Sequence, residues 1–154
     1  MLYKVLNLLH KLYPAKDVYA HCDIPCGIYT AEPALTAAKT VVKMVEKIQE
    51  LEPPSFPVPN ITEAKSKLNS LVRYVQVKEE HAQICKKELL ILWTDYFKPE
   101  HLDMFPGLHD TFWKAAKLCS KNKQEVNMEA AQALQTAVEE IAAMFQKAEE
   151  AKAS

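Results

Sequence analysis

The chain has 154 residues, of which 49% are hydrophobic and 25% are charged, and its formal net charge is −1. This composition is typical of one globular domain with enough apolar residues for a core, and the balanced charge argues against a nucleic-acid-binding protein. No apolar run approaches the roughly 18 residues that cross a bilayer, and four cysteines are too few for a secreted module held together by disulfides.

The first twenty residues, MLYKVLNLLHKLYPAKDVYA, partly resemble a targeting signal. Val18 and Ala20 are small residues at the positions expected before a cleavage site ahead of His21. A secretory signal needs about 7–15 apolar residues together, but charged and polar residues interrupt every run here. We therefore predict that residues 1–20 form a removable leader, or propeptide, and that the protein is cytoplasmic.

The next segment reads HCDIPCGIY and concentrates metal-binding side chains. His21, Cys22 and Cys26 are ligand types that transition metals prefer. Pro25 and Gly27 favour a tight turn that brings the two sulfurs together. A structural zinc ion usually takes four side-chain ligands, and the usual redox spacing is C-x-x-C, so neither pattern is met. From the spacing alone, a transition-metal site ranks first, a redox dithiol second and an accidental cluster third.

Four amphipathic helices are predicted after this segment, because apolar residues recur at helical spacing and glycine is nearly absent. The predicted helices cover Pro33–Leu51, Ile61–Trp93, Leu108–Ser120 and Met128–Lys152. Asn60 and Glu63 form a sequence typical of a capping box at the start of the second helix. No stretch alternates with a period of two, so we predict an all-α fold. Residues 21–154 should form one antiparallel up-down-up-down four-helix bundle with an irregular N-terminal metal hook at residues 21–29.

Other cysteines and histidines are expected to be structural. Cys85 and Cys119 fall within helical patterns and should be small buried hydrophobic residues. His81 stands four residues before Cys85, so a metal pair on one helix face is conceivable, but a packed histidine beside a core cysteine is the commoner arrangement. The remaining histidines have no second ligand at a useful spacing: His10, His101 and His109.

The hook and one later stretch resemble a known enzyme family. HCDIPCGIY is similar to the nickel-hook motif of the nickel superoxide dismutases, His-Cys-x-x-Pro-Cys-Gly-x-Tyr. The stretch LWTDYFKPEH, from Leu92 to His101, resembles that family's other characteristic segment. The order of a hook and then four helices also matches from His21 to the end. The resemblance implies that superoxide is converted to dioxygen and hydrogen peroxide while nickel cycles between its +2 and +3 states.

The resemblance also implies a set of ligands for one nickel ion per subunit. The expected equatorial ligands are the freed α-amine of His21, the backbone nitrogen of Cys22, and the thiolates of Cys22 and Cys26. The His21 imidazole is the expected axial ligand of the oxidised state. A tetragonal, nitrogen-rich site with thiolate donors suits nickel, which agrees with this implication.

Further residues are implied to lie around the hook: Asp23, Tyr29, Asp95, Tyr96 and Lys98. The candidates for a part in catalysis are Tyr29, Asp23 and Lys98, and Tyr29 is expected to screen the open face of nickel and bind small anions or water. Plainer interpretations remain, since Tyr29 could pack the hook onto the bundle and Asp23 could bind backbone amides in the turn. We expect two neighbouring aromatic residues, Trp93 and Phe97, to be packing residues.

One departure from the family concerns the axial histidine. Some members support it with an acidic residue on the first helix and an arginine on the second, where this chain has Ala37 and His81. The equatorial ligand set is intact, but that support is absent or rebuilt.

The implied partners are superoxide as substrate, a peptidase that removes the leader, and other copies of the chain in a homohexamer, with neither nucleic acid nor membrane. The alternative is a non-enzymatic helical protein or metal carrier whose hook binds copper, zinc or nickel.

Overall fold

The computed structural model describes residues 27–53 and 60–153, and this part of the chain is helical, with no strand. The four long helices are α2 (Glu32–Gln49), α3 (Ile61–Ile91), α4 (Leu108–Gln124) and α5 (Met128–Ala153). Their starts agree with the sequence prediction within one residue, and α4 continues one turn further than predicted. No helix in these two ranges is both long enough and apolar enough to cross a membrane.

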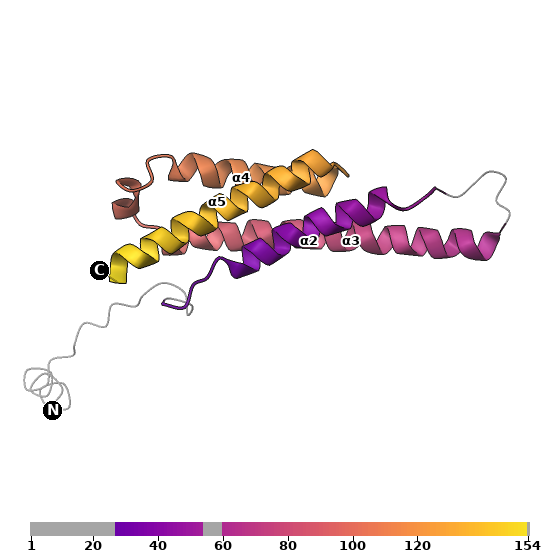
Figure 1. The fold of residues 1–154 in the computed structure, drawn as a ribbon, viewed down its shortest axis with the longest axis horizontal. Coiled ribbons are helices and arrows are strands. Elements are labelled where there is room, and N and C mark those ends of the chain that lie inside the picture. Colours follow the sequence, from indigo (N-terminus) through magenta and orange to yellow (C-terminus); the bar gives the residue numbers. More distant parts are fainter. Residues whose placement is uncertain (1–26, 54–59, 154) are drawn as a thin grey trace, which may run out of the picture.

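The helices form a four-membered ring. Both α2 and α4 pack against α3 and α5, and the chain reverses direction from each helix to the next (Figure 1). This arrangement confirms the predicted antiparallel up-down-up-down bundle. The predicted leader and hook residues 1–26 lie outside the described residues.

Mostly apolar side chains fill the space between the helices. In α2 the buried side chains recur every three or four residues, as the helical period requires when one face meets the core: Ala34, Ala37, Ala38, Val41 and Val45. The corresponding face of α4 carries Leu108, Phe112, Ala115, Cys119 and Asn122. The predictions that Cys85 and Cys119 are buried are confirmed, because both are 0% exposed.

The first turns of α3 differ from the sequence prediction. The helical spacing of its apolar residues predicts Leu68 on the buried face of this helix, but 52% of Leu68 is exposed, and Val72 one turn later is also exposed. The reason is length, since α3 has 31 residues whereas α2 has 18. The N-terminal part of α3 therefore extends beyond the ends of the other helices (Figure 1). Asn60 caps this helix as predicted, accepting hydrogen bonds from the backbone N–H groups of Thr62 and Glu63.

The C-terminal end of α3 widens into a π-helical turn at Leu92–Tyr96. Its characteristic bond is donated by the Phe97 N–H to the Leu92 carbonyl, five residues back, at 3.0 Å. The backbone then becomes extended at Lys98, the residue before a proline, as proline sterics require. The wider turn buries both Tyr96 and Phe97. Such turns often lie at functional sites.

A buried lysine connects α3 to the end of α4. Lys78 is 1% exposed, and its Nζ donates hydrogen bonds to the carbonyl oxygens of Asn122, Lys123 (3.3 Å) and Glu125 (3.1 Å). Those carbonyls stand at a helix C-terminus, where backbone acceptors lack intrahelical donors. Burial lowers the pKa of Lys78. The ammonium group therefore closes α4 and helps to set its position along α3.

Candidate metal centre

The chain enters the bundle just after the hook motif. Gly27 is exposed and has a φ of +94°, a left-handed conformation that glycine adopts without strain. Tyr29, two residues later, is half-buried and places its ring edge-on to the Tyr96 ring, with 6.0 Å between the centroids. Tyr29 therefore packs the end of the hook segment against the π-helical turn of α3. The other predicted hook residues lie outside the described residues: His21, Cys22, Asp23 and Cys26.

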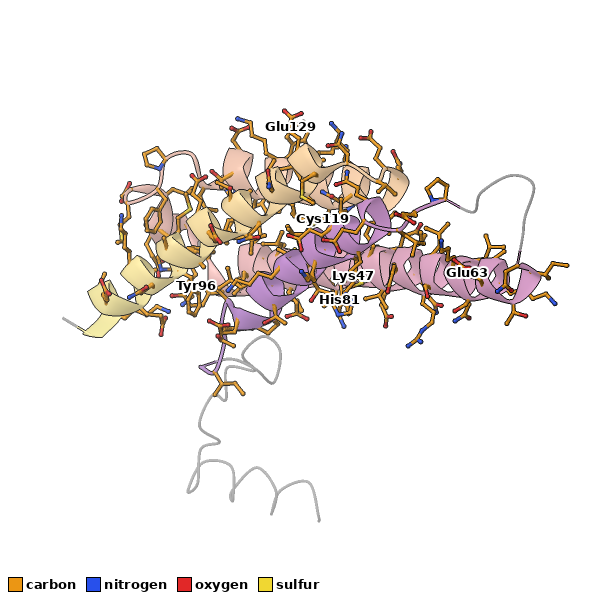
Figure 2. The ribbon with its side chains drawn as sticks, turned by 45° about the vertical axis from the view of Figure 1, so that its right-hand side comes forward. Lys47, Glu63, His81, Tyr96, Cys119 and Glu129 are labelled. Carbon is orange, nitrogen blue, oxygen red and sulfur yellow. The ribbon has the colours of Figure 1, made fainter. Side chains whose placement is uncertain are left out.

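Tyr96 is the centre of the contacts at this end of the bundle, where α2 begins (Figure 2). Its hydroxyl donates a 2.6 Å hydrogen bond to Glu149 Oε1 on α5. The centroid of its ring lies 4.4 Å from that of the Phe145 ring. The ring also stacks nearly parallel to the His101 ring, with 5.8 Å between the centroids. Burial, reinforced by the bond to Glu149, raises the pKa of Tyr96 well above its usual value. The phenol therefore keeps its proton at neutral pH.

Charged residues of α5 cover Tyr96 on its outer side. Lys152 Nζ lies 4.1 Å from the centroid of the Tyr96 ring and 2.7 Å from Glu149 Oε1. The hydrogen bond that Lys152 donates lowers the pKa of Glu149, and the hydrogen bond from Tyr96 acts in the same direction with a smaller effect. No motif in the sequence marks Glu149 and Lys152, although their spacing of three is that of neighbours on one helix face. They attach the C-terminal turns of α5 to the site.

His101 is buried beside Tyr96, with 5% of it exposed. Its Nδ1 accepts a 2.9 Å hydrogen bond from the Lys98 backbone N–H, so the ring proton is assigned to Nε2. The Lys98 side chain is exposed and borders a small cavity of about 110 Å³. His101 therefore holds the backbone of the segment that carries the candidate Lys98.

The neighbouring residues of the second family segment are packed as expected or bonded locally. Trp93 stacks on Phe112, with 5.8 Å between ring centroids, and its indole N–H donates to His109 Nδ1 at 2.8 Å. Phe97 is buried in the core. These contacts confirm that Trp93 and Phe97 are packing residues. Asp95 is half-buried and accepts a 3.0 Å hydrogen bond from the hydroxyl of Thr94.

Ala37 and His81 stand where, by the resemblance, some family members carry the residues that support the axial histidine, and both have other roles here. Ala37 is a buried core residue that cannot donate or accept through its side chain. His81 is half-buried, and its Nδ1 is 2.9 Å from the Val77 carbonyl oxygen of its own helix. Within the described ranges, no group of three or more His, Cys, Asp or Glu side chains could hold a metal ion. His81 and Cys85 therefore lack a third ligand there.

Comparisons with known proteins agree with this architecture. A profile of the family described as nickel-containing superoxide dismutase matches residues 16–149. The protein named superoxide dismutase [Ni] of Streptomyces seoulensis is 34% identical over 117 residues, which is 75% of this chain and 79% of that protein. The protein of the same name from Streptomyces coelicolor is 32% identical over equal shares.

Solved structures give the same result. A native nickel superoxide dismutase structure aligns with a TM-score of 0.70 at 27% identity, covering 84% of this chain and 99% of the other. A nickel-containing superoxide dismutase with the ligation of its oxidised state aligns with a TM-score of 0.68 at 29% identity, over the same shares. Because the family profile covers the hook motif, the π-helical turn, three of the long helices and α5 up to residue 149, the chain belongs to the nickel-containing superoxide dismutase family.

Proposed function

We propose that this chain disproportionates superoxide with one nickel ion held by His21, Cys22 and Cys26. The reaction follows from the family: two superoxide radicals and two protons give dioxygen and hydrogen peroxide. The observation that carries the proposal is that one family match spans both the hook sequence and the bundle that supports it. Neither the match nor the named relatives favour a non-enzymatic metal carrier.

The donor set fits nickel chemistry. Two thiolates, an amine, a deprotonated backbone nitrogen and an imidazole are the donors that the motif offers, and such mixed nitrogen and sulfur sets suit nickel. The bound ion supplies a one-electron couple, and the anionic donors stabilise its higher oxidation state. The described part of the chain offers no competing cluster of ligands.

The leader keeps this donor set incomplete until it is removed. Before cleavage, the nitrogen of His21 is an amide bonded to Ala20. A free α-amine has a pKa of about 7.7–8.0 and is a good donor once it is deprotonated, whereas an amide must lose a much less acidic proton. We therefore propose that a peptidase removes residues 1–20, and that this cleavage completes the nickel site.

Tyr29, Asp23 and Lys98 are the proposed catalytic residues around the metal. The contact between Tyr29 and Tyr96 supports a position for the Tyr29 phenol between the hook and the bundle, where it binds water or small anions. Asp23, next to the ligand Cys22, orders the turn. Both roles follow from the family motif and from the point at which the hook segment joins α2.

Lys98 supplies positive charge for an anionic substrate. Removing residues 1–20 takes away three lysines and one aspartate, so the net charge changes from −1 to about −3. A protein with this charge does not attract superoxide over a long range, so local cations must do so. Lys98 is exposed and lies two residues after Tyr96, at the end of the bundle where the hook segment enters.

We also propose that the mature subunits form a cytoplasmic homohexamer, as the family resemblance implies. A nine-residue hook is too small to exclude water from a metal by itself, and a neighbouring subunit can cover it. Light scattering of the nickel-loaded mature protein tests the assembly.

The experiment compares three forms of the chain: full length, starting at Ala20, and starting at His21. Each is loaded with nickel, and its metal content and superoxide consumption are measured together. Only the form that starts at His21 should be active, and the Ala20 form should remain inactive despite differing by one residue. Full activity of the Ala20 form would show that the amine is not a ligand. Nickel binding by the His21 form without superoxide consumption would refute the catalytic role.

A further inference from the structure

Two cysteines outside the proposed nickel site face each other in the middle of the bundle. Cys85 on α3 and Cys119 on α4 are both 0% exposed, and neither is in a disulfide. A hydrogen-bond interaction between the two thiols has the largest effect on the pKa of each. Cys119 lies between the helices, well inside the bundle (Figure 2).

Contacts on one side of the pair hold the two helices in register. Lys86 Nζ donates to Ser120 Oγ at 3.1 Å, directly beside the two cysteines. Towards the end of α4, Lys123 Nζ donates to Gln83 Oε1 at 2.8 Å. Residue numbers fall along α3 as they rise along α4, as antiparallel packing requires. The facing position of the sulfurs is therefore set by the surrounding contacts.

Towards the start of α4, further contacts fix the position of α3 against α4 on the other side of the two cysteines. Trp93 on the π-helical turn stacks on Phe112 of α4 and donates to His109. Ala115 lies one turn of α4 from Cys119 on this side, and Ala82 lies about one turn of α3 from Cys85 on the other; both are 0% exposed. The buried α3 residues between Cys85 and Trp93 are Leu89 and Leu92. Small residues allow two helices to approach closely. A close approach is what a disulfide requires, because the Cα atoms it joins must lie within about 7 Å.

We propose that Cys85 and Cys119 are a redox-active pair that hydrogen peroxide converts into a disulfide joining α3 to α4. Peroxide is the product of the dismutase reaction, so the oxidant forms on the same molecule. In the first step the Cys119 thiolate attacks one peroxide oxygen, the O–O bond breaks, and the other oxygen leaves as water after taking a proton. The Cys85 sulfur then attacks the resulting sulfenic acid, the S–O bond breaks, and a second water leaves. In total, two thiols and one peroxide give one disulfide and two waters.

The surroundings assign different roles to the two sulfurs. The hydrogen bond with Cys85 lowers the pKa of Cys119, and the nearby cations Lys86 and Lys123 act in the same direction. The same hydrogen bond, together with burial, raises the pKa of Cys85. Lys86 bonds to Ser120, the residue after Cys119, so Cys119 has the cation that favours an attacking thiolate, and Cys85 is then the resolving thiol. Because both are buried, the reaction requires local opening between α3 and α4, so the pair responds to accumulated peroxide rather than to each turnover.

Peptide mapping of peroxide-treated enzyme tests this proposal. The nickel-loaded mature protein is incubated with hydrogen peroxide, alkylated under non-reducing conditions and digested with trypsin. A linked pair of peptides, Glu79–Lys86 and Leu118–Lys121, should appear with a mass two hydrogens below the sum of its parts. A reductant should remove it. The disulfide closes a long loop, so it should also raise the thermal unfolding midpoint by about 10 °C relative to an equally treated Cys119→Ala control.

Several results would overturn the proposal. Full alkylation of both peptides after unfolding would show that peroxide leaves the thiols reduced. A link from either cysteine to Cys22 or Cys26, or a sulfonic acid on one of the pair, would show different chemistry. Because the peroxide is added directly, these results do not depend on whether the enzyme consumes superoxide.

Discussion

Replacing Lys78 with methionine should lower the free energy of unfolding without changing the activity of folded enzyme. The Lys78 ammonium donates to three carbonyl oxygens at the C-terminus of α4. Methionine is unbranched and apolar, so it fills most of the same volume but cannot donate. The substitution therefore removes the donors and leaves the packing largely in place.

The magnitude follows from the burial of each acceptor. The bond to Asn122 is buried, so its carbonyl left without a donor costs about 1–3 kcal/mol. The bonds to Lys123 and Glu125 are partly buried, so water can replace the ammonium there and each loss costs about 0.5–1 kcal/mol. Removing a buried ammonium offsets part of this cost, since burial already disfavours its charge. The net loss should be about 2–3 kcal/mol.

Urea unfolding followed by helical circular dichroism measures this loss. The midpoint should fall while the dependence on urea concentration stays the same. The matched control is Lys121→Met, which removes an exposed 3.9 Å ion pair with Glu125 and should cost less than about 0.5 kcal/mol. Activity per bound nickel should not change, because Lys78 lies five turns of α3 from Tyr96, roughly 27 Å along the helix axis. A loss no larger than that of the control would refute the role given to Lys78.

Three other predictions concern the metal, the substrate and pH. Replacing Cys22 or Cys26 with serine should abolish superoxide consumption without changing the helical circular dichroism spectrum, because both residues precede α2, the first helix of the bundle. Activity above about a tenth of the original would contradict the thiolate ligands. Lys98→Glu should lower the second-order rate constant for superoxide most at low ionic strength, whereas the control Lys117→Glu, at an exposed position on α4, should not lower it. Equal effects of the two substitutions would show that Lys98 does not attract the substrate. The raised pKa of Tyr96 contributes stability that is complete below about pH 10 and is lost as the pH rises towards the pKa of Tyr96 in the folded protein. In urea unfolding at alkaline pH, Tyr96→Phe should remove this loss of stability, and an unchanged pH dependence would assign the loss to another group.

The local sequence determined the helices and pointed to the chemistry. The helical spacing of apolar residues, the cap at Asn60 and the near absence of glycine sufficed to predict the four helices of the bundle, because these signals act within a few residues of each other. The hook motif combines residue types with a spacing that few other sites share. It could therefore be recognised from nine letters, although its ligands remain predictions.

Tertiary structure alone decided which distant residues meet. The bond from Tyr96 to Glu149 joins positions 53 residues apart, and it exists because the π-helical turn directs the phenol towards α5. Nothing near Cys85 in the sequence indicates that Cys119 lies opposite, because that depends on how far α3 and α4 slide along each other. Lys78 was hidden for the same reason, since a lysine on a helix is normally solvated until a neighbouring helix end supplies its acceptors. Helical periodicity fixes which face of a helix is buried, but the register between helices is set only when the side chains of both are packed together.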